Sequence, residues 1–171
     1  MKKKNIINFS EICEAMEDNS PEFRHYLDLQ TGEVIIDSDY YGEPDREKLF
    51  NKIEQNSERY NLIPTISSYE GYQDMENFIY TVGNEKLQNE LSRVIQGRGA
   101  FRRFKDVLSQ NPEEQIRWCD FKNKIIQQKA KEWLEGLGMK VREKDTKDNW
   151  VEERIQKKKK LIDDTINMFV E

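Results

Sequence analysis

Apolar residues recur at helical spacing through most of this chain and alternate with polar residues in only one short stretch. Near the N-terminus, Phe9, Ile12, Cys13 and Met16 follow the i, i+3, i+4, i+7 pattern of one helix face. This spacing predicts a first short helix, with Ser10 as its N-terminal cap and Pro21 beyond its end.

The alternating stretch is FRHYLDLQTGEVIID, residues 23–37. It holds nearly alternating apolar positions, a turn-forming Gln-Thr-Gly-Glu run at 30–33, and the β-branched run 34–36. Together these features predict a β-hairpin. A loop is expected over 37–44 and a helix over about 44–58. The segment NLIPTI at 61–66 predicts a short edge strand, because Pro64 cannot donate a hydrogen bond to a neighbouring strand.

From Ser67 onward the periodicity is helical. Ser67 with Glu70 matches a capping box, and the expected helix then presents Tyr69, Tyr72, Met75, Ile79 and Val82 on one face. A second helix follows and ends at Gly97; its apolar face is Leu87, Leu91, Val94 and Ile95. A third is expected from about residue 99. A fourth begins at Asn111-Pro112, and its apolar stripe is Ile116, Cys119, Ile126, Ala130, Trp133 and Leu137.

The C-terminal segment differs from the rest in its charge pattern. Residues 141–149 are a charged break, and apolar residues then recur at helical spacing over 150–170 around four consecutive lysines. We therefore predict an α+β fold, predominantly α-helical, with a small N-terminal antiparallel sheet of two to three strands. Residues 1–140 are expected to form a single domain, and 141–171 a charged linker with a C-terminal amphipathic helix. Homodimerisation through 150–170 is one role for that helix.

Charge is unevenly spread over the 171 residues, whose net charge is -5. Such a balance argues against whole-molecule binding to nucleic acid. Residues 97–140 nevertheless carry ten cations and six anions, a local net charge of +4. The two cysteines are far apart, which fits a reducing compartment, and no apolar run approaches the roughly 18 residues of a membrane span. The N-terminus lacks the pattern of a signal peptide. We expect a cytoplasmic protein without membrane contact.

Several chemistries lack their required residues. His25 is the only histidine, so a multi-histidine metal site is excluded and a partly buried structural role is expected. The acidic stretch from Asp37 begins like a calcium loop, but Lys48 stands where a bidentate Glu is required, which leaves a solvated acidic loop. No metal, cofactor or catalytic constellation is predicted. Enzymatic activity has no support in the sequence, although paired carboxylates alone do not exclude it.

The segment GRGAFRRFKD at 97–106 is the most unusual in the chain. On a helical wheel its apolar residues Phe101, Phe104 and Leu108 share one side, whereas the cations gather opposite. Those cations are Arg98, Arg102 and Lys105, with Arg103 on the flank. We call Arg98, Arg102 and Lys105 the basic ridge. It starts at a helix N-terminus, where free N–H groups also attract anions, and Gly97 and Gly99 allow close backbone approach.

Three interpretations of the basic ridge remain open at this stage. It is a solvated face whose arginines pair with surface acids, an anion or nucleic-acid contact, or a protein-docking surface. The Gly-x-Gly spacing is no dinucleotide fingerprint, because Arg102 stands at the third glycine position and a helix precedes it.

Four segments together resemble a known family. They are YLDLQTGEV (26–34), IPTISSYEGY (63–72), GRGAFRRFKD (97–106) and the spacing from Trp118 to Trp133-Leu134. Their order is similar to that in an uncharacterised bacterial protein family, number 0158 of those of unknown function. The resemblance covers about 8–140. It implies a small bacterial cytoplasmic protein, and it carries over no activity and no catalytic residue.

The resemblance also implies that Ser67 and Ser68 accompany the arginine segment. If the two helix starts meet, these hydroxyls with Arg98 or Arg102 would form an anion pocket. Our leading hypothesis is a non-enzymatic binding or regulatory module that uses residues 98–105 on an anionic partner or a protein. The alternatives are a nucleic-acid-associated protein and an enzyme acting on a phosphorylated small molecule.

Overall fold

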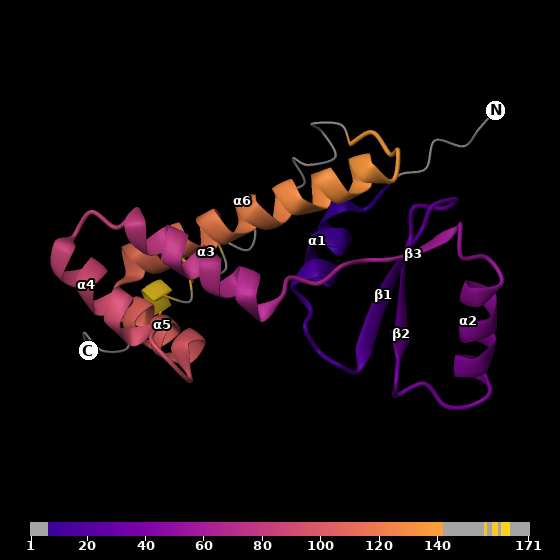
Figure 1. The fold of residues 1–171 in the computed structure, drawn as a ribbon, viewed down its shortest axis with the longest axis horizontal. Coiled ribbons are helices and arrows are strands. Elements are labelled where there is room, and N and C mark those ends of the chain that lie inside the picture. The colour runs from indigo at the N-terminus through magenta and orange to yellow at the C-terminus, as the bar shows by residue number, and fades with distance from the viewer. Residues whose placement is uncertain (1–6, 142–155, 157–158, 161, 165–171) are drawn as a thin grey trace. The chain divides into compact units, whose positions relative to one another are not determined.

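The computed structural model describes residues 7–141, 156, 159–160 and 162–164. Its helices and strands, in chain order, are α1 (Phe9–Glu17), β1 (Phe23–Asp28), β2 (Val34–Ser38), α2 (Asp45–Glu54), β3 (Tyr60–Leu62), α3 (Ser68–Tyr80), α4 (Glu85–Val94), α5 (Ala100–Ser109) and α6 (Pro112–Gly136). The predicted α+β class is confirmed: helices dominate, and a small antiparallel sheet lies near the N-terminus (Figure 1).

The elements belong to two compact units. One unit combines the chain up to Ile66 with the part of α6 that begins at Ile126, and the other contains Ser67–Ile125. Helix α6 therefore contributes its first half to the second unit and its last turns to the first.

The sheet of the first unit has the strand order β2-β1-β3, and both pairings are antiparallel. In its register, Tyr26 of the central strand lies opposite Ile35 on one side and Leu62 on the other. The predicted hairpin and the predicted edge strand are both confirmed. The edge strand ends at Leu62, two residues before Pro64, so the proline does not interrupt any pairing.

Asp28 links the hairpin to the edge strand. This side chain is almost fully buried and accepts hydrogen bonds from the backbone N–H groups of Gln30 and Thr31, at 2.8 and 3.3 Å. It also accepts hydrogen bonds from Nε and Nη2 of Arg59, at 2.8 and 2.6 Å. Because Arg59 directly precedes β3, this ion pair fixes the third strand to the hairpin turn.

Helix α1 buries the predicted face. Phe9, Ile12, Cys13 and Met16 are each at most 2% exposed. The predicted cap is wrong: Asn8 accepts the hydrogen bond from the Glu11 N–H, at 3.4 Å. Ser10 lies inside the first turn, and its hydroxyl donates to the Asn8 side chain at 2.7 Å.

The predicted acidic loop after the hairpin is also corrected. Asp37 is buried in β2, directly opposite Arg24 of β1, whose Nε donates to it at 2.9 Å. Arg46 of α2 reaches both Asp37 and Asp39. The strand register places these opposite charges together, so the acids form a network of ion pairs. Helix α2 buries none of its own residues, and Phe50 remains 56% exposed.

The second unit is built around an aromatic cluster. Phe78 of α3, Phe104 of α5, and Trp118 and Phe121 of α6 meet with ring centroids 5.0 to 6.2 Å apart. Most of these pairs have the edge-to-face geometry that aromatic quadrupoles favour. Leucines and isoleucines of α3 and α4 complete the core. Four helices therefore share one apolar centre.

Helix α6 buries only part of the predicted stripe: Ile126 and Ala130 are buried as predicted, whereas Ile116, Cys119, Trp133 and Leu137 are only partly buried. Its buried residues are Trp118, Asn123, Ile126, Ala130 and Leu134. A single face was expected, but the two halves of this helix pack in different units. Glycine chemistry follows the end of this helix: Gly138 adopts a left-handed φ of 76°, and the Met139 N–H donates to the Leu134 carbonyl at 3.0 Å.

Two predictions fall largely outside the described residues. The charged linker over 141–149 and the amphipathic helix over 150–170 cannot be compared with the structure, and the same holds for a dimer built through that helix. The division of the chain at residue 140 stays a prediction.

The Asp28–Arg59 pair generates a pH-dependent prediction. Hydrogen bonds from Arg59 lower the pKa of Asp28 from its ordinary 3.8 to about 2, although burial opposes this change. A lowered carboxyl pKa stabilises the fold above about pH 4, and this contribution disappears as the pH falls toward 2. The shift corresponds to about 2 kcal/mol. We therefore expect Asp28→Asn to lower the free energy of unfolding by about 2 kcal/mol at pH 7, measured by urea titration.

The matched control is Asp39→Asn, an acid near the end of the same hairpin whose side chain is 51% exposed. This substitution should lower the free energy of unfolding by less than about 1 kcal/mol, as for exposed ion pairs. The difference in the free energy of unfolding between Asp28→Asn and the wild type should become smaller as the pH falls from 4 to 2. Equal losses of unfolding free energy in both variants would contradict a stabilising role of the Asp28–Arg59 pair. A loss in Asp28→Asn that does not depend on pH would also contradict it.

Candidate functional site

The turn between α4 and α5 determines how the arginine segment is presented. Gly97 and Gly99 both adopt left-handed backbone conformations, with φ of 75° and 77°. Residues with a Cβ rarely adopt this conformation, so the two glycines allow the chain to turn between Val94 and Ala100. Gly99 occupies the N-cap position of α5 without any side-chain cap, and no acid stands in the first turn. The positive end of this helix therefore lacks a negative side chain of its own.

Arg103 has a structural role within the predicted anion-binding group. Its Nε and Nη2 donate to the carbonyls of Val94 and Gln96, both at 2.7 Å, and its Nη1 donates to the Arg98 carbonyl. A Cβ at Gly99 would lie 3.0 Å from this guanidinium. Arg103 thus satisfies the carbonyls at the end of α4, and its three bonded nitrogens face the protein backbone.

The basic ridge is exposed as predicted. Arg98, Arg102 and Lys105 all lie on the surface. The side chain of Arg102 is 88% exposed and has Asp106 as a partner, with 3.9 Å between Nε and Oδ2. At this separation and exposure the ion pair is weak. The donors of the basic ridge therefore remain accessible to a ligand.

Phe101 departs from the predicted core face. It is 41% exposed, whereas Phe104, Val107 and Leu108 are buried. Its ring lies against Gly71 in the first half of α3, where an added methyl group would be 3.2 Å from Cε1 of Phe101. Glycine offers no side chain to cover the ring. This contact places the N-terminal parts of α3 and α5 beside each other.

The predicted serines lie at the start of α3. Ser67 forms the predicted capping box: its hydroxyl accepts from the Glu70 N–H at 3.2 Å and donates to Glu70 Oε2 at 2.9 Å. Ser68 is exposed at the first helical position. The anion pocket that would join these hydroxyls to Arg98 or Arg102 stays a prediction.

Other candidate chemistry is limited in the described part of the chain. His25 lies in β1 with a side chain only 11% exposed, and its Nε2 is 3.7 Å from Asp18. Among residues 7–141 and the few described beyond them, no group of three or more His, Cys, Asp or Glu is placed to hold a metal. None of the helices described combines the length and hydropathy needed to cross a bilayer.

The fold and this site define a helix-rich α+β protein that presents a basic helix face. Residues 2–154 match the uncharacterised protein family UPF0158, so the chain belongs to that family. The match reaches beyond the 8–140 region of the expected resemblance.

The chain is 30% identical over 129 residues to a UPF0158 protein of Pseudomonas aeruginosa, covering 75% of this chain and 81% of that protein. It is 28% identical to a UPF0158 protein of Chlamydia trachomatis over 135 residues, which cover 75% of this chain. The matched region spans 40% of the chlamydial protein's length. No solved structure matches the chain.

The role of Arg103 leads to a stability prediction. Arg103→Met should lower the free energy of unfolding by about 2 kcal/mol, because charged hydrogen bonds are lost and the carbonyls at the end of α4 lose their partner. The matched control Arg102→Met removes an exposed cation one residue away and should change stability by less than about 0.5 kcal/mol. Urea unfolding of both variants measures the difference. Equal effects would show that Arg103 does not secure the turn.

Proposed function

We propose that this protein is a non-enzymatic cytoplasmic binding module, which uses the basic ridge to hold the acidic surface of a partner protein. The observation that carries the proposal is that neighbouring cations differ in their contacts. Arg103 is committed to backbone carbonyls, while Arg98, Arg102 and Lys105 stay exposed around an uncapped helix start.

The chemistry of the basic ridge suits carboxylates. Guanidinium groups form paired hydrogen bonds with carboxylates, and a free helix start adds N–H donors and a favourable dipole. Exposed aromatic rings lie near the same helix starts: Phe101 at 41% and Tyr69, two residues before Gly71, at 71%. Arginine, tyrosine and phenylalanine are enriched in protein interfaces, which favours a protein partner.

The two alternatives have less support. Nucleic-acid binding is disfavoured by the 33 acidic residues, which exceed the 28 Lys and Arg. For the enzyme alternative, an acid with a shifted pKa beside Arg98 or Arg102 would be needed. Among the described residues, Asp18 and Asp28 have lowered pKa values, and hydrogen bonds from Ser20 and Arg59 cause these shifts, not the cations of the basic ridge. The cytoplasmic location is supported by the two widely separated cysteines.

Binding of a fluorescent polyglutamate peptide tests this function. We expect salt-sensitive binding to the full chain, because exposed charge pairs are screened. The double variant Arg98→Glu/Arg102→Glu should weaken it by at least about tenfold, since two attractive contacts become repulsive. Fluorescence anisotropy at several salt concentrations measures the affinity.

The control Lys86→Glu/Lys131→Glu changes the net charge equally at two exposed positions that do not belong to the basic ridge, and it should leave the affinity within about twofold. A parallel titration with single-stranded RNA distinguishes the partner class. RNA binding that is tighter than polyglutamate binding and lost in the ridge variant would replace the protein partner with nucleic acid. Absence of binding to either probe at low salt would overturn an anionic partner.

A further inference from the structure

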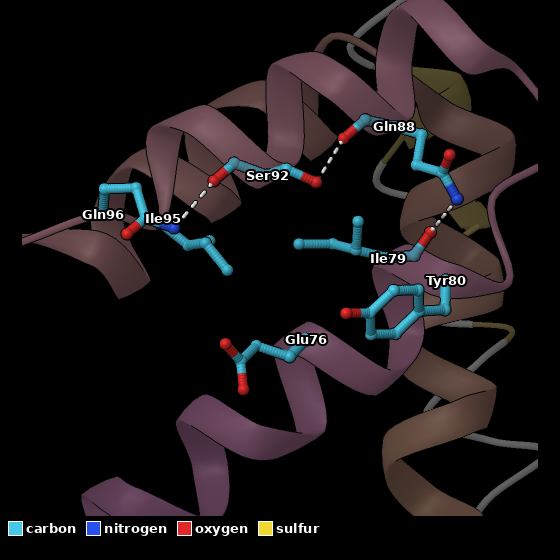
Figure 2. A pocket seen from close by; sticks show the side chains of 7 residues that line it. All are labelled: Glu76, Ile79, Tyr80, Gln88, Ser92, Ile95 and Gln96. Atoms are coloured by element: carbon cyan, nitrogen blue, oxygen red, sulfur yellow. Dashed lines mark hydrogen bonds between the residues drawn. The ribbon is translucent and has the colours of Figure 1, made fainter.

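A pocket of about 220 Å³ lies between α3 and α4 in the second unit. Figure 2 shows its residues on two facing helix walls. Ile79 of α3 and Ile95 at the end of α4, each 3% exposed, form its apolar floor. The volume is below the roughly 300–1,000 Å³ typical of drug-sized ligand sites. It therefore suits one side chain better than a large cofactor.

The α4 wall carries three polar residues four positions apart. Each donates to a carbonyl of its own unit: Gln88 Nε2 to Ile79 at 3.0 Å, Ser92 Oγ to Gln88 at 2.9 Å, and Gln96 Nε2 to Ser92 at 3.2 Å. Ser92 has thereby committed its only donor, and each glutamine has committed part of its amide. The oxygen atoms of these side chains keep their acceptor capacity.

The α3 wall adds a carboxylate and a phenol. Glu76 and Tyr80 are one helical turn apart, and both line the pocket (Figure 2). The side chain of Glu76 is exposed and forms no hydrogen bond or ion pair with another described residue. Tyr80 is 82% exposed, so its ring is accessible to a ligand that contacts the carboxylate.

We propose that this pocket binds the arginine side chain of a basic segment in a partner polypeptide. The pocket offers a carboxylate and several acceptor oxygens over an apolar floor. A guanidinium has five donors and no acceptor, and its aliphatic stem matches the two isoleucines. Residues 65–96 carry two cations and five anions, so the surroundings also favour a cation.

Arginine fits these walls better than lysine. Its planar group can donate to Glu76 and to a glutamine oxygen together, and it stacks on an aromatic ring such as Tyr80. An ammonium group has three donors, but it is a compact charge without the planar face that stacks on a ring. The site is separate in chemistry from the basic ridge, since the two attract opposite charges, and it does not depend on the function proposed for the ridge.

The test is a titration of the ¹⁵N-labelled full chain with N-acetyl-arginine methylamide, followed by NMR. We expect shifts of the Gln88 and Gln96 side-chain amides and of backbone signals in α3 and α4. The citrulline analogue has nearly the same shape without the charge, and it should bind at least about fivefold more weakly. The lysine analogue should also bind more weakly than the arginine compound.

Glu76→Gln should weaken binding of the arginine probe about fivefold, and Tyr80→Ala is a second variant at an exposed position. Both should fold like the wild type, which their backbone spectra will show. The control Glu85→Gln removes an exposed acid of α4 outside the pocket and should keep the affinity. The ridge variant Arg98→Glu/Arg102→Glu should also keep it, which separates this site from the basic ridge.

Three results would overturn the proposal: no shifts around the pocket at millimolar probe, equal binding of the citrulline analogue, or undiminished binding to Glu76→Gln. Spectra of the unliganded chain across a concentration series test a second copy as the occupant. Concentration-dependent shifts at the pocket that compete with the probe would replace the partner segment with a second copy.

Discussion

The hydrogen bonds of the Arg103 guanidinium hold together the region on which the candidate site depends. They join the carbonyls of Val94, Gln96 and Arg98, so the end of α4, the glycine turn and the start of α5 are tied by one side chain. Helical spacing then determines the rest: when Arg103 faces the turn, Arg102 and Lys105 face away from it. The surface that we propose as a binding site is therefore defined by a cation that does not itself belong to it.

Gln96 extends this dependence to the second site. Its carbonyl accepts from Arg103, and its side-chain amide donates to Ser92 on the wall of the pocket. The last turn of α4 is thus shared by the basic ridge and the pocket. One short segment therefore supports two surfaces that are proposed to attract opposite charges. The aromatic cluster of Phe78, Phe104 and Trp118 supplies the apolar core beneath the helices.

Local signals in the sequence were enough for the element types, because a capping box, a left-handed glycine or a hairpin turn depends on neighbouring residues. Apart from the N-cap of α1, where Asn8 replaces the predicted Ser10, the failures occurred where distant partners decide. Asp37 became buried because the register sets Arg24 opposite to it, and Arg103 was assigned to a flank because a wheel does not show where carbonyls of the previous helix lie. Phe101 has an apolar position in the pattern, but Gly71 leaves its ring partly uncovered. The pocket requires the relative placement of α3 and α4, which no single-helix pattern contains.

A net charge of -5 does not prevent a local site from attracting anions. At physiological ionic strength the Debye length is about 8 Å, so an exposed ligand responds mainly to the charges within roughly that distance. The basic ridge lies in a segment with a local excess of four positive charges, whereas the preceding helices carry an excess of three negative charges. Screening makes these two fields nearly independent. The same screening limits the reach of each site, so contact chemistry must decide the choice of partner: paired hydrogen bonds from arginine on the basic ridge, and acceptor oxygens over an apolar floor in the pocket.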